Sequence, residues 1–464
     1  MSPDPLNREL IELVGEDAVT FAPHHNPDDL HDESLHATHV EPYAVVRPTT
    51  TDQVAALVRL AGREGRAVTA RGSGTGLSGG ATPVAGGIVV SFERMNRFLH
   101  LDTSDHMAVV QPGITLRELN DRLAGSGLRY PVYPGELSGS LGGNVNTNAG
   151  GMRAVRHGVT RHHVVGLELV LADATVVRTG GPVVKTSSGY DLTQLVIGSE
   201  GTLALVTEIT LRLSPAMEHA ATVLVPFADL AEVTRVVPRV VASGLEPAML
   251  EYLDVLTMAS ITQAAGLELG VDAGVAAQTS AYLVIVLETR TAEQLDGDLE
   301  HLAALVNDAG ALDVYVLPSG AATKLIEARE RAFWVAKAAG AHEILDVVVP
   351  RSKVPEFLAE AQRLAVVNDA MITGCGHVGD GNVHLSVFQP DDEQRRELLT
   401  ELFRFGLSLG GQISGEHGIG VDKQGPFLEL SDPVWLAVQR RVKDAFDPHH
   451  LFNPYRLLDE RTPE

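Results

Sequence analysis

Arg71-Gly72-Ser73-Gly74-Thr75-Gly76-Leu77-Ser78-Gly79-Gly80 is the stretch of the sequence that decides the fold. It follows a predicted strand, and its glycines have the G-x-G-x-x-G spacing of a Rossmann dinucleotide site, with Glu93 about twenty residues further on. That site requires a helix to begin at the second glycine. Residues 77–87 cannot hold a helix, because they contain four glycines and a proline. The Rossmann interpretation therefore fails, and the loop is predicted to be a phosphate cradle of backbone N–H groups without a helix.

The segments around this loop predict a β-α-β opening. Residues 43–48 and 67–70 have the pattern of short strands, and residues 87–92 that of another. Between the first two, residues 51–65 carry apolar side chains at helical spacing, with Thr51 as the expected N-cap. A polar leader precedes them, to about residue 40.

Two further glycine loops follow, at 133–151 and 197–203. Predicted strands at 164–171, 175–178 and 203–213 separate and follow them. Glycine allows the backbone to approach a ligand closely, so this concentration of glycine indicates one large bound molecule, a dinucleotide, rather than simple turns.

After Pro215 the pattern changes to strands that alternate with amphipathic helices. Strands are predicted at 221–226 and 280–287, and helices at 230–243, 292–310, 321–339, 355–368 and 393–410. This pattern is typical of an antiparallel sheet covered by helices, and it predicts a second domain. Charged residues of the 321–339 helix, Arg329 among them, have the ordinary interpretation of a solvated face.

His377-Val378-Gly379-Asp380-Gly381-Asn382-Val383-His384 is the motif most indicative of chemistry. The glycines allow a turn that brings His377 and His384 together, and two imidazoles with a carboxylate are a common ligand set for a divalent metal. From Asn382 onward the alternation predicts a half-buried strand with Asn382, His384 and Ser386 on one face. The alternative is a pair of structural histidines. The nearby Glu416-His417 pair favours a functional site.

Composition limits the class of protein. With 464 residues, 44% hydrophobic and 21% charged, the chain is expected to be an ordinary globular protein of two domains. A net charge of −24 argues against nucleic acid as a partner. Cys375 is the single cysteine, so this chain holds no internal disulfide and no cysteine-bound iron-sulfur cluster. No secretion signal is visible, and we expect a cytoplasmic location, either free or peripheral at the inner face of the membrane.

Together the three glycine loops, the 377–384 run, the 414–420 segment and the tail from Phe446 to Pro454 resemble one family. It is the FAD-linked 2-hydroxy-acid dehydrogenases of the vanillyl-alcohol-oxidase fold, which includes D-lactate dehydrogenase, the glycolate oxidase flavin subunit and D-2-hydroxyglutarate dehydrogenase. The resemblance implies an α+β fold with a PCMH-type FAD-binding domain at 1–215 and an antiparallel-sheet-plus-helices substrate and metal domain at 216–445. Residues 446–464 would return to the FAD domain.

The resemblance also implies roles for individual residues. The metal ligands would be His377, His384 and Glu416, with Zn²⁺ or Mn²⁺ as the expected ion. The catalytic base would be His417, with Asn382 as a substrate contact and Arg329 as the clamp for the substrate carboxylate. FAD would be held without a covalent bond, because the first loop lacks a histidine. Its contacts would be Arg71, Gly72, Ser73, Gly74, Thr75, Gly76, Ser78, Gly79, Pro134, Gly135, Ser138, Gly139, Ser140, Gly142, Gly143, Asn148, Gly150, Gly151, Glu200, Gly201 and Asn453.

These roles predict oxidation of a small D-2-hydroxy acid, such as lactate or glycolate, to the 2-oxo acid. D-2-hydroxyglutarate is the alternative substrate, but the place where the resemblance leads us to look for a lysine holds Ile344. Other interpretations are an electron-transfer subunit of a larger oxidase, or a flavin transferase like the ether-lipid alkyl synthases. The electron acceptor stays open between a quinone, a cytochrome, an electron-transfer flavoprotein and an iron-sulfur subunit, and homodimerisation also stays open.

Overall fold

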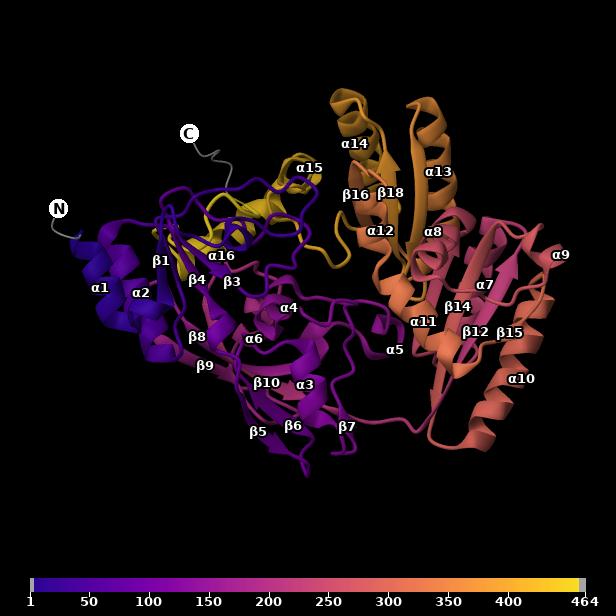
Figure 1. Ribbon diagram of the computed structural model, residues 1–464, viewed down its shortest axis with the longest axis horizontal. Helices are drawn as coiled ribbons and strands as arrows, with labels where there is room; N and C mark the ends of the chain where they lie inside the picture. Colours follow the sequence, from indigo (N-terminus) through magenta and orange to yellow (C-terminus); the bar gives the residue numbers. More distant parts are fainter. Residues whose placement is uncertain (1–3, 459–464) are drawn as a thin grey trace.

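The computed structural model describes residues 4–458, which form two parts side by side along the long axis of the molecule (Figure 1). The first part contains three sheets and extends to β11 (Ser214–Pro215). The second is built on one sheet that begins with β12 (His219–Phe227). The break between them falls at the change of sequence pattern near Pro215. The structure confirms the α+β class and the antiparallel sheet with helices that was expected after Pro215.

A four-stranded sheet of order β1-β2-β4-β3 carries the first glycine loop at the end of β3. Its apolar strands pack against a helical stripe of α2 that includes Val54, Leu57 and Val58, all fully buried. Thr50, not Thr51, caps α2, because the Thr50 side chain accepts a hydrogen bond from the N–H of Gln53. The elements are α1 (Pro5–Val14), β1 (Val19–Phe21), β2 (Ala44–Val46), α2 (Thr51–Glu64), β3 (Val68–Arg71) and β4 (Ile88–Ser91). No helix forms in residues 72–87, as expected.

A five-stranded antiparallel sheet of order β5-β6-β10-β8-β9 forms the rest of the first part. Its strands are β5 (Phe98–Asp102), β6 (Met107–Val110), β8 (Val164–Val170), β9 (Val176–Gly180) and β10 (Leu205–Arg212), with β7 (Leu128–Arg129) paired to β11. Its helices are α3 (Leu116–Leu123), α4 (Leu141–Thr147), α5 (Ala154–His157) and α6 (Leu192–Val196). The sequence did not predict α4, which lies inside the second glycine loop and is capped by Ser140.

The second part is a seven-stranded antiparallel sheet of order β15-β12-β14-β13-β17-β18-β16. Its other strands are β13 (Met249–Asp254), β14 (Ala281–Thr289), β15 (Tyr315–Val316), β16 (Glu343–Val348), β17 (Met371–Gly376) and β18 (Asn382–Phe388). One face packs against α7 (Leu230–Ala242), α10 (Ala292–Asp308), α13 (Val354–Val367) and α14 (Asp392–Ser408). The other face lies under α8 (Val255–Ala265), α11 (Ser319–Glu330) and α12 (Ala332–Ala338), with α9 (Ala273–Ala276) at the edge.

The helix predicted at 321–339 is broken into α11 and α12 at Arg331, whose backbone leaves the helical region with a ψ of 2°. The expectation that its charged residues form a solvated face is wrong for Arg329, whose side chain is 11% exposed and pairs with Glu251. The break places the end of α11 over the sheet, and this position buries Arg329.

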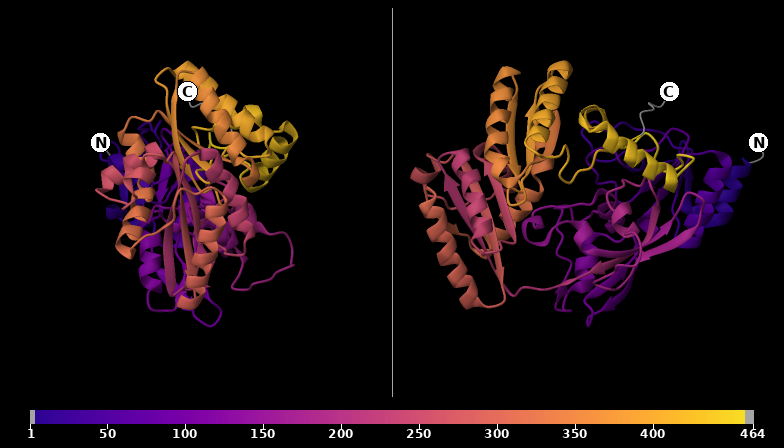
Figure 2. Two further views of the ribbon diagram at one scale, coloured as in Figure 1. Left: turned by 90° about the vertical axis from the view of Figure 1, so that its right-hand side faces the viewer. Right: turned by 180° about the vertical axis from the view of Figure 1, so that it is seen from behind.

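The C-terminal segment crosses back to the first part (Figures 1 and 2): α15 (Gln424–Leu430) still packs against α14, and α16 (Pro433–Phe446) leads on to the first part. Phe452 pairs with Val68 beside β3, and Leu451 and Phe452 belong to the core of the four-stranded sheet. At the end of α16, Lys443 and Asp447 form a buried ion pair in which Nζ lies 2.5 Å from Oδ2. None of the helices in residues 4–458 is long and apolar enough to cross a membrane.

Candidate active site

The three glycine loops enclose one long cavity in the first part of the molecule. Its wall includes fifteen of the residues expected to contact FAD. They are Arg71, Gly72, Ser73, Gly74, Thr75, Gly76, Ser78, Pro134, Gly139, Ser140, Gly142, Gly143, Gly150, Glu200 and Gly201. The cavity is thus formed by loops that are far apart in the sequence but meet at the ends of the strands.

The chemistry of this wall fits a phosphate-bearing ligand. The backbone N–H groups from Gly74 to Leu77 find no acceptor within residues 4–458. Asn144, which α4 presents to the cavity, has a buried side-chain N–H₂ without a hydrogen-bond partner. Unpaired donors of this kind are costly unless a ligand accepts from them, and phosphate oxygens are good acceptors.

Some residues expected to contact FAD are placed differently. Gly79, Ser138, Asn148, Gly151 and Asn453 do not line this cavity, and Gly135 lines the neighbouring one. The Asn453 side chain instead donates to the carbonyls of Gly80 and Glu200 at 2.9 and 2.8 Å, which ties the tail to two loops. Sequence reasoning missed Phe92, Pro112, Asn146, Thr147 and the strand entrance 204–206, all in the wall.

Arg71 lines the cavity, but its guanidinium serves the protein. It donates to the carbonyl of His31 at 2.7 Å and to that of Asp28, and it lies 3.7 Å from the Asp29 carboxylate. These contacts fasten the first glycine loop to the N-terminal segment. We therefore interpret Arg71 as a support of the loop rather than as a phosphate clamp.

A second cavity lies over the seven-stranded sheet and shares six wall residues with the first. They are Thr75, Leu77, Pro134, Glu136, Glu416 and His417. The two cavities therefore meet at Glu416 and His417. A reactant in the second cavity would face a cofactor in the first across this junction.

His377, His384 and Glu416 come together at that junction. Glu416 Oε1 lies 3.2 Å from His377 Nε2 and 3.3 Å from His384 Nε2, and the two rings are 4.9 Å apart. The turn depends on Gly381, which has a φ of +90° and where a Cβ would lie 2.0 Å from the Val349 carbonyl oxygen. Three ligand atoms from two imidazoles and a carboxylate can hold a divalent cation with open positions.

The charges of these three side chains depend on one another. Burial disfavours a charged His377, but the Glu251 and Glu416 carboxylates overcome this and hold its pKa well above the usual range. Burial likewise opposes ionisation of Glu416, yet His377 and His384 hold its pKa well below the usual range. The protein thus keeps a ligand carboxylate ionised beside a histidine that must lose a proton to bind a metal.

Glu251 supports the site from β13 and was not predicted. Its fully buried carboxylate lies 2.6 Å from His377 Nδ1 and 2.9 Å from the Arg329 guanidinium. A carboxylate on Nδ1 orients the ring so that Nε2 faces the metal position. The buried Nε of Arg329 has no hydrogen-bond partner within residues 4–458, and Arg329 lines the second cavity, as a carboxylate clamp would.

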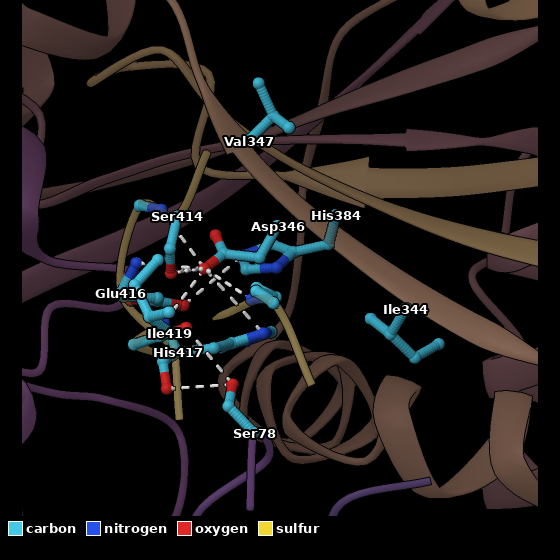
Figure 3. Close-up of polar contacts among 12 residues, drawn as sticks. Ser78, Ile344, Asp346, Val347, His384, Ser414, Glu416, His417 and Ile419 are labelled. Carbon is cyan, nitrogen blue, oxygen red and sulfur yellow. Dashed lines mark hydrogen bonds and ion pairs between the residues drawn. The ribbon is translucent and has the colours of Figure 1, made fainter. Parts of the chain in front are cut away.

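Asp346 holds the 414–417 segment in place, as Figure 3 shows. Its Oδ2 accepts hydrogen bonds from the Ser414 hydroxyl at 2.7 Å and from the backbone N–H groups of Gly415, Glu416 and His417 at 2.9–3.1 Å. The carboxylate is fully buried, which raises its pKa, but nearby His417 and Lys423 lower it well below the usual range. A stable anion therefore fixes the backbone that carries both Glu416 and His417.

The expectation that Asn382 contacts the substrate is not supported by its position. Its side-chain N–H₂ donates to Asp346 Oδ1 at 2.7 Å and to the Val347 carbonyl at 3.1 Å, and it lines neither cavity. Asn382 faces the same side of β18 as His384, as predicted, but it is used to hold Asp346.

The 414–420 segment is also bound to the glycine loops. The Ser78 hydroxyl donates to the carbonyls of His417 and Gly418 at 3.1 and 3.2 Å, and the Glu200 carboxylate accepts from the N–H groups of Ile419 and Gly420 at 2.7 Å. The segment therefore has a fixed position relative to both cavities.

His417 is available as a base at neutral pH. Burial lowers the pKa of its imidazole, the Asp346 carboxylate 3.8 Å from Nδ1 opposes this, and Lys423 and His384 add to the lowering, so that the net pKa is about 4. The ring is neutral at pH 7, so it can accept a proton. The low pKa of His417 also means that the pKa of the group that gives up its proton must be lowered if proton transfer is to be rapid.

Comparison with known proteins identifies the family of the chain. Residues 42–180 match the family described as FAD binding domain, and residues 216–457 match FAD linked oxidases, C-terminal domain. An uncharacterised FAD-linked oxidoreductase of Mycobacterium tuberculosis is 50% identical over 443 residues, covering 96% of both chains. A D-lactate dehydrogenase of Anaerostipes hadrus is 35% identical over 442 residues, 93% of both.

The fold is that of solved flavoproteins. A p-cresol methylhydroxylase with substrate bound superposes with a TM-score of 0.79 at 18% identity, covering 98% of this chain and 96% of the other. At this identity the likeness shows the fold alone, and it confirms the predicted PCMH-type architecture. The chain belongs to the family of FAD-linked oxidases, and its first cavity is formed by the FAD-binding domain of that family.

Proposed function

We propose that this protein is an FAD-dependent, divalent-metal-assisted D-2-hydroxy-acid dehydrogenase that forms the 2-oxo acid. The observation that carries the proposal is the junction of the two cavities at Glu416 and His417, with Arg329 in the wall of the second. A monocarboxylic acid gripped by Arg329 would place its hydroxyl carbon near this junction. The named relatives, such as the D-lactate dehydrogenase of Anaerostipes hadrus, support the class of reaction.

The side chains have separate tasks. Arg329 binds and orients the carboxylate, and Glu251 contacts both Arg329 and His377 and fixes their relative positions. His417 accepts the hydroxyl proton on its imidazole. FAD supplies the two-electron acceptor for the hydrogen on C2. A cation held by His377, His384 and Glu416 supplies a Lewis acid that lowers the pKa of the hydroxyl.

A screen of 2-hydroxy acids tests the proposal. Mixing the oxidised holoenzyme anaerobically with D-2-hydroxy acids is expected to bleach the flavin absorbance, with the 2-oxo acid formed in equal amount. Alcohols that lack the carboxylate should not bleach it, because they offer Arg329 no carboxylate to bind. An enzyme whose flavin no 2-hydroxy acid reduces would not have this function.

We expect FAD to be bound without a covalent link. The first glycine loop contains no histidine, and the cavity offers hydrogen-bond donors that can hold the cofactor. Precipitating the protein with acid should release the yellow colour into the supernatant. Colour that stays in the pellet would contradict this expectation.

Glu251→Gln is expected to weaken metal binding by about 10–100-fold, because an amide holds the His377 ring less firmly than a carboxylate. Metal titration of the holoenzyme, followed by elemental analysis, measures the loss. Glu268→Gln is the matched control, since Glu268 is exposed and lines neither cavity. Equal metal affinity in both variants would remove Glu251 from the support of the ligand.

A further inference from the structure

The wall of the second cavity continues beyond the residues that would hold the hydroxyl and the carboxylate of a 2-hydroxy acid. It extends away from the metal-ligand cluster along β16, β17 and β18, under α8 and α12. The residues that line this extension decide which substrate side chain it accepts. The strand register gives the order in which these residues follow one another.

The floor of the extension consists of successive rows of side chains across the sheet. The first row, at the cluster, contains Cys375, His384 and Asp346, which are paired across β17, β18 and β16. The next row contains Thr373, Ser386 and Ile344, and the row after it contains Phe388. Rows on one face are two residues apart, which is roughly 7 Å. Figure 3 shows Ile344 on the same side of β16 as Asp346, with Val347 on the other.

The roof of the extension is mostly apolar. It is lined by Phe333, Trp334 and Ala336 of α12, by Ala339 just after that helix and by Ile261 of α8, together with the hydroxyl-bearing Thr257 and Ser260 of α8. We call the space between this roof and the rows of Ile344 and Phe388 the side-chain chamber. An aliphatic or aromatic group enters such a space favourably because apolar surface is removed from water.

The charged side chains of the cavity wall lie outside this chamber's floor and roof. They are Glu136, Arg329, Glu330, His377, His384, Glu416 and His417, and Arg329 is the one permanently cationic side chain of the wall within residues 4–458. Lys337, on α12, does not line the cavity. Its Nζ lies 3.2 Å from Glu33 Oε2 and above the rings of Phe333 and Trp334. A second carboxylate in the chamber would find hydroxyl groups, such as those of Thr373 and Ser386, but no cation in the described wall of the chamber.

We propose that the substrate is a 2-hydroxy acid with a long, uncharged and mainly apolar side chain, held in the side-chain chamber while Arg329 binds its carboxylate. This deepens the proposed function and rests on it. It differs from the lactate- or glycolate-sized substrate expected from the sequence, because a methyl group would leave the rows of Ile344 and Phe388 uncovered.

A series of D-2-hydroxy acids of increasing length tests the proposal on the holoenzyme. From lactate to 2-hydroxyhexanoate, kcat/KM for anaerobic flavin reduction should rise about fourfold for each methylene, or roughly sixty-fold for the three methylenes. The affinity of the matching 2-oxo acids, read from the change they cause in the flavin spectrum, should rise in parallel. 2-Hydroxyglutarate should be at least about a hundredfold poorer than 2-hydroxyhexanoate, because its second carboxylate would be buried without a cationic partner.

Ile344→Lys tests the chamber directly. It places a cation in the second row and should shift the ratio of kcat/KM for 2-hydroxyglutarate over 2-hydroxyhexanoate by at least about a hundredfold. Val366→Lys is the matched control, because Val366 is 82% exposed on α13 and lines neither cavity, so its profile should equal that of the wild type. Ala336→Phe should fill the chamber and lower the ratio for 2-hydroxyhexanoate over lactate without adding charge.

The outcomes separate the two proposals. A rate that is flat or falls with chain length, in an enzyme that oxidises lactate or glycolate, overturns the chamber and leaves the proposed function standing. A wild type that prefers 2-hydroxyglutarate also overturns it. If no 2-hydroxy acid reduces the flavin, both proposals fall. Rising rates that Ile344→Lys and Ala336→Phe do not change would place the apolar contact elsewhere and overturn the chamber as well.

Discussion

His417→Ala is expected to slow flavin reduction by roughly two to four orders of magnitude, because the hydroxyl proton would lose its acceptor. The backbone bonds of residue 417 do not depend on its ring: its N–H donates to Asp346 at 2.9 Å and its carbonyl accepts from Ser78 at 3.1 Å. The variant should therefore fold, keep FAD and metal, and still bind the acid. Anaerobic stopped-flow measurement of the flavin absorbance gives the rate.

Glu416→Ala is the comparison that separates proton transfer from metal binding. It should lose metal first, and excess metal should restore part of its rate, whereas added metal cannot replace the base missing in His417→Ala. Flavin reduction at nearly the wild-type rate in His417→Ala would refute the assignment and direct the search to other titratable groups at the cavity junction.

Removing the metal is expected to abolish substrate-dependent bleaching while hardly changing the melting temperature. Without a cation, Glu416 lies between His377 and His384 at 3.2 and 3.3 Å, and the raised pKa of His377 makes it the positive partner. These ion pairs keep the cluster satisfied, so the fold does not depend on the metal. Zinc or manganese should restore activity.

The measurement combines bleaching assays with thermal unfolding before and after treatment with a chelator. Metal binding displaces the proton of His377, so affinity should also fall as the pH is lowered. Full activity in an exhaustively metal-free sample would remove His377, His384 and Glu416 from the mechanism. A large fall in melting temperature would assign the metal a structural role instead.

The sequence was most informative where local patterns carry local geometry. The absence of a helix after Arg71, the half-buried strand from Asn382 and the convergence of His377 with His384 all follow from glycine placement and residue alternation within short segments. The helix α4 was missed because helical propensity is poor at Gly142 and Gly143, and the Ser140 cap and contacts with neighbouring loops overcome it.

The residues that hold the site together could not be paired from the sequence. Asp346 and Glu251 each lie between buried apolar residues of a strand, which is itself a signal, because a buried carboxylate needs partners. However, the partners of Asp346 on the 414–417 segment lie 68 to 71 residues further along the chain, and His377 lies 126 residues after Glu251. No spacing rule connects these positions. Asn382 was misjudged for the same reason, since its proximity to Asp346 is set by the strand register.

The contacts of Ser78 and Glu200 with residues 417–420 limit how this enzyme can move. Gly420, where a Cβ would lie 1.8 Å from the Ser78 carbonyl oxygen, allows the two segments to touch. A hinge that separated the two parts would break these bonds and carry His417 away from the first cavity, so we expect reactants to enter and leave without such a movement.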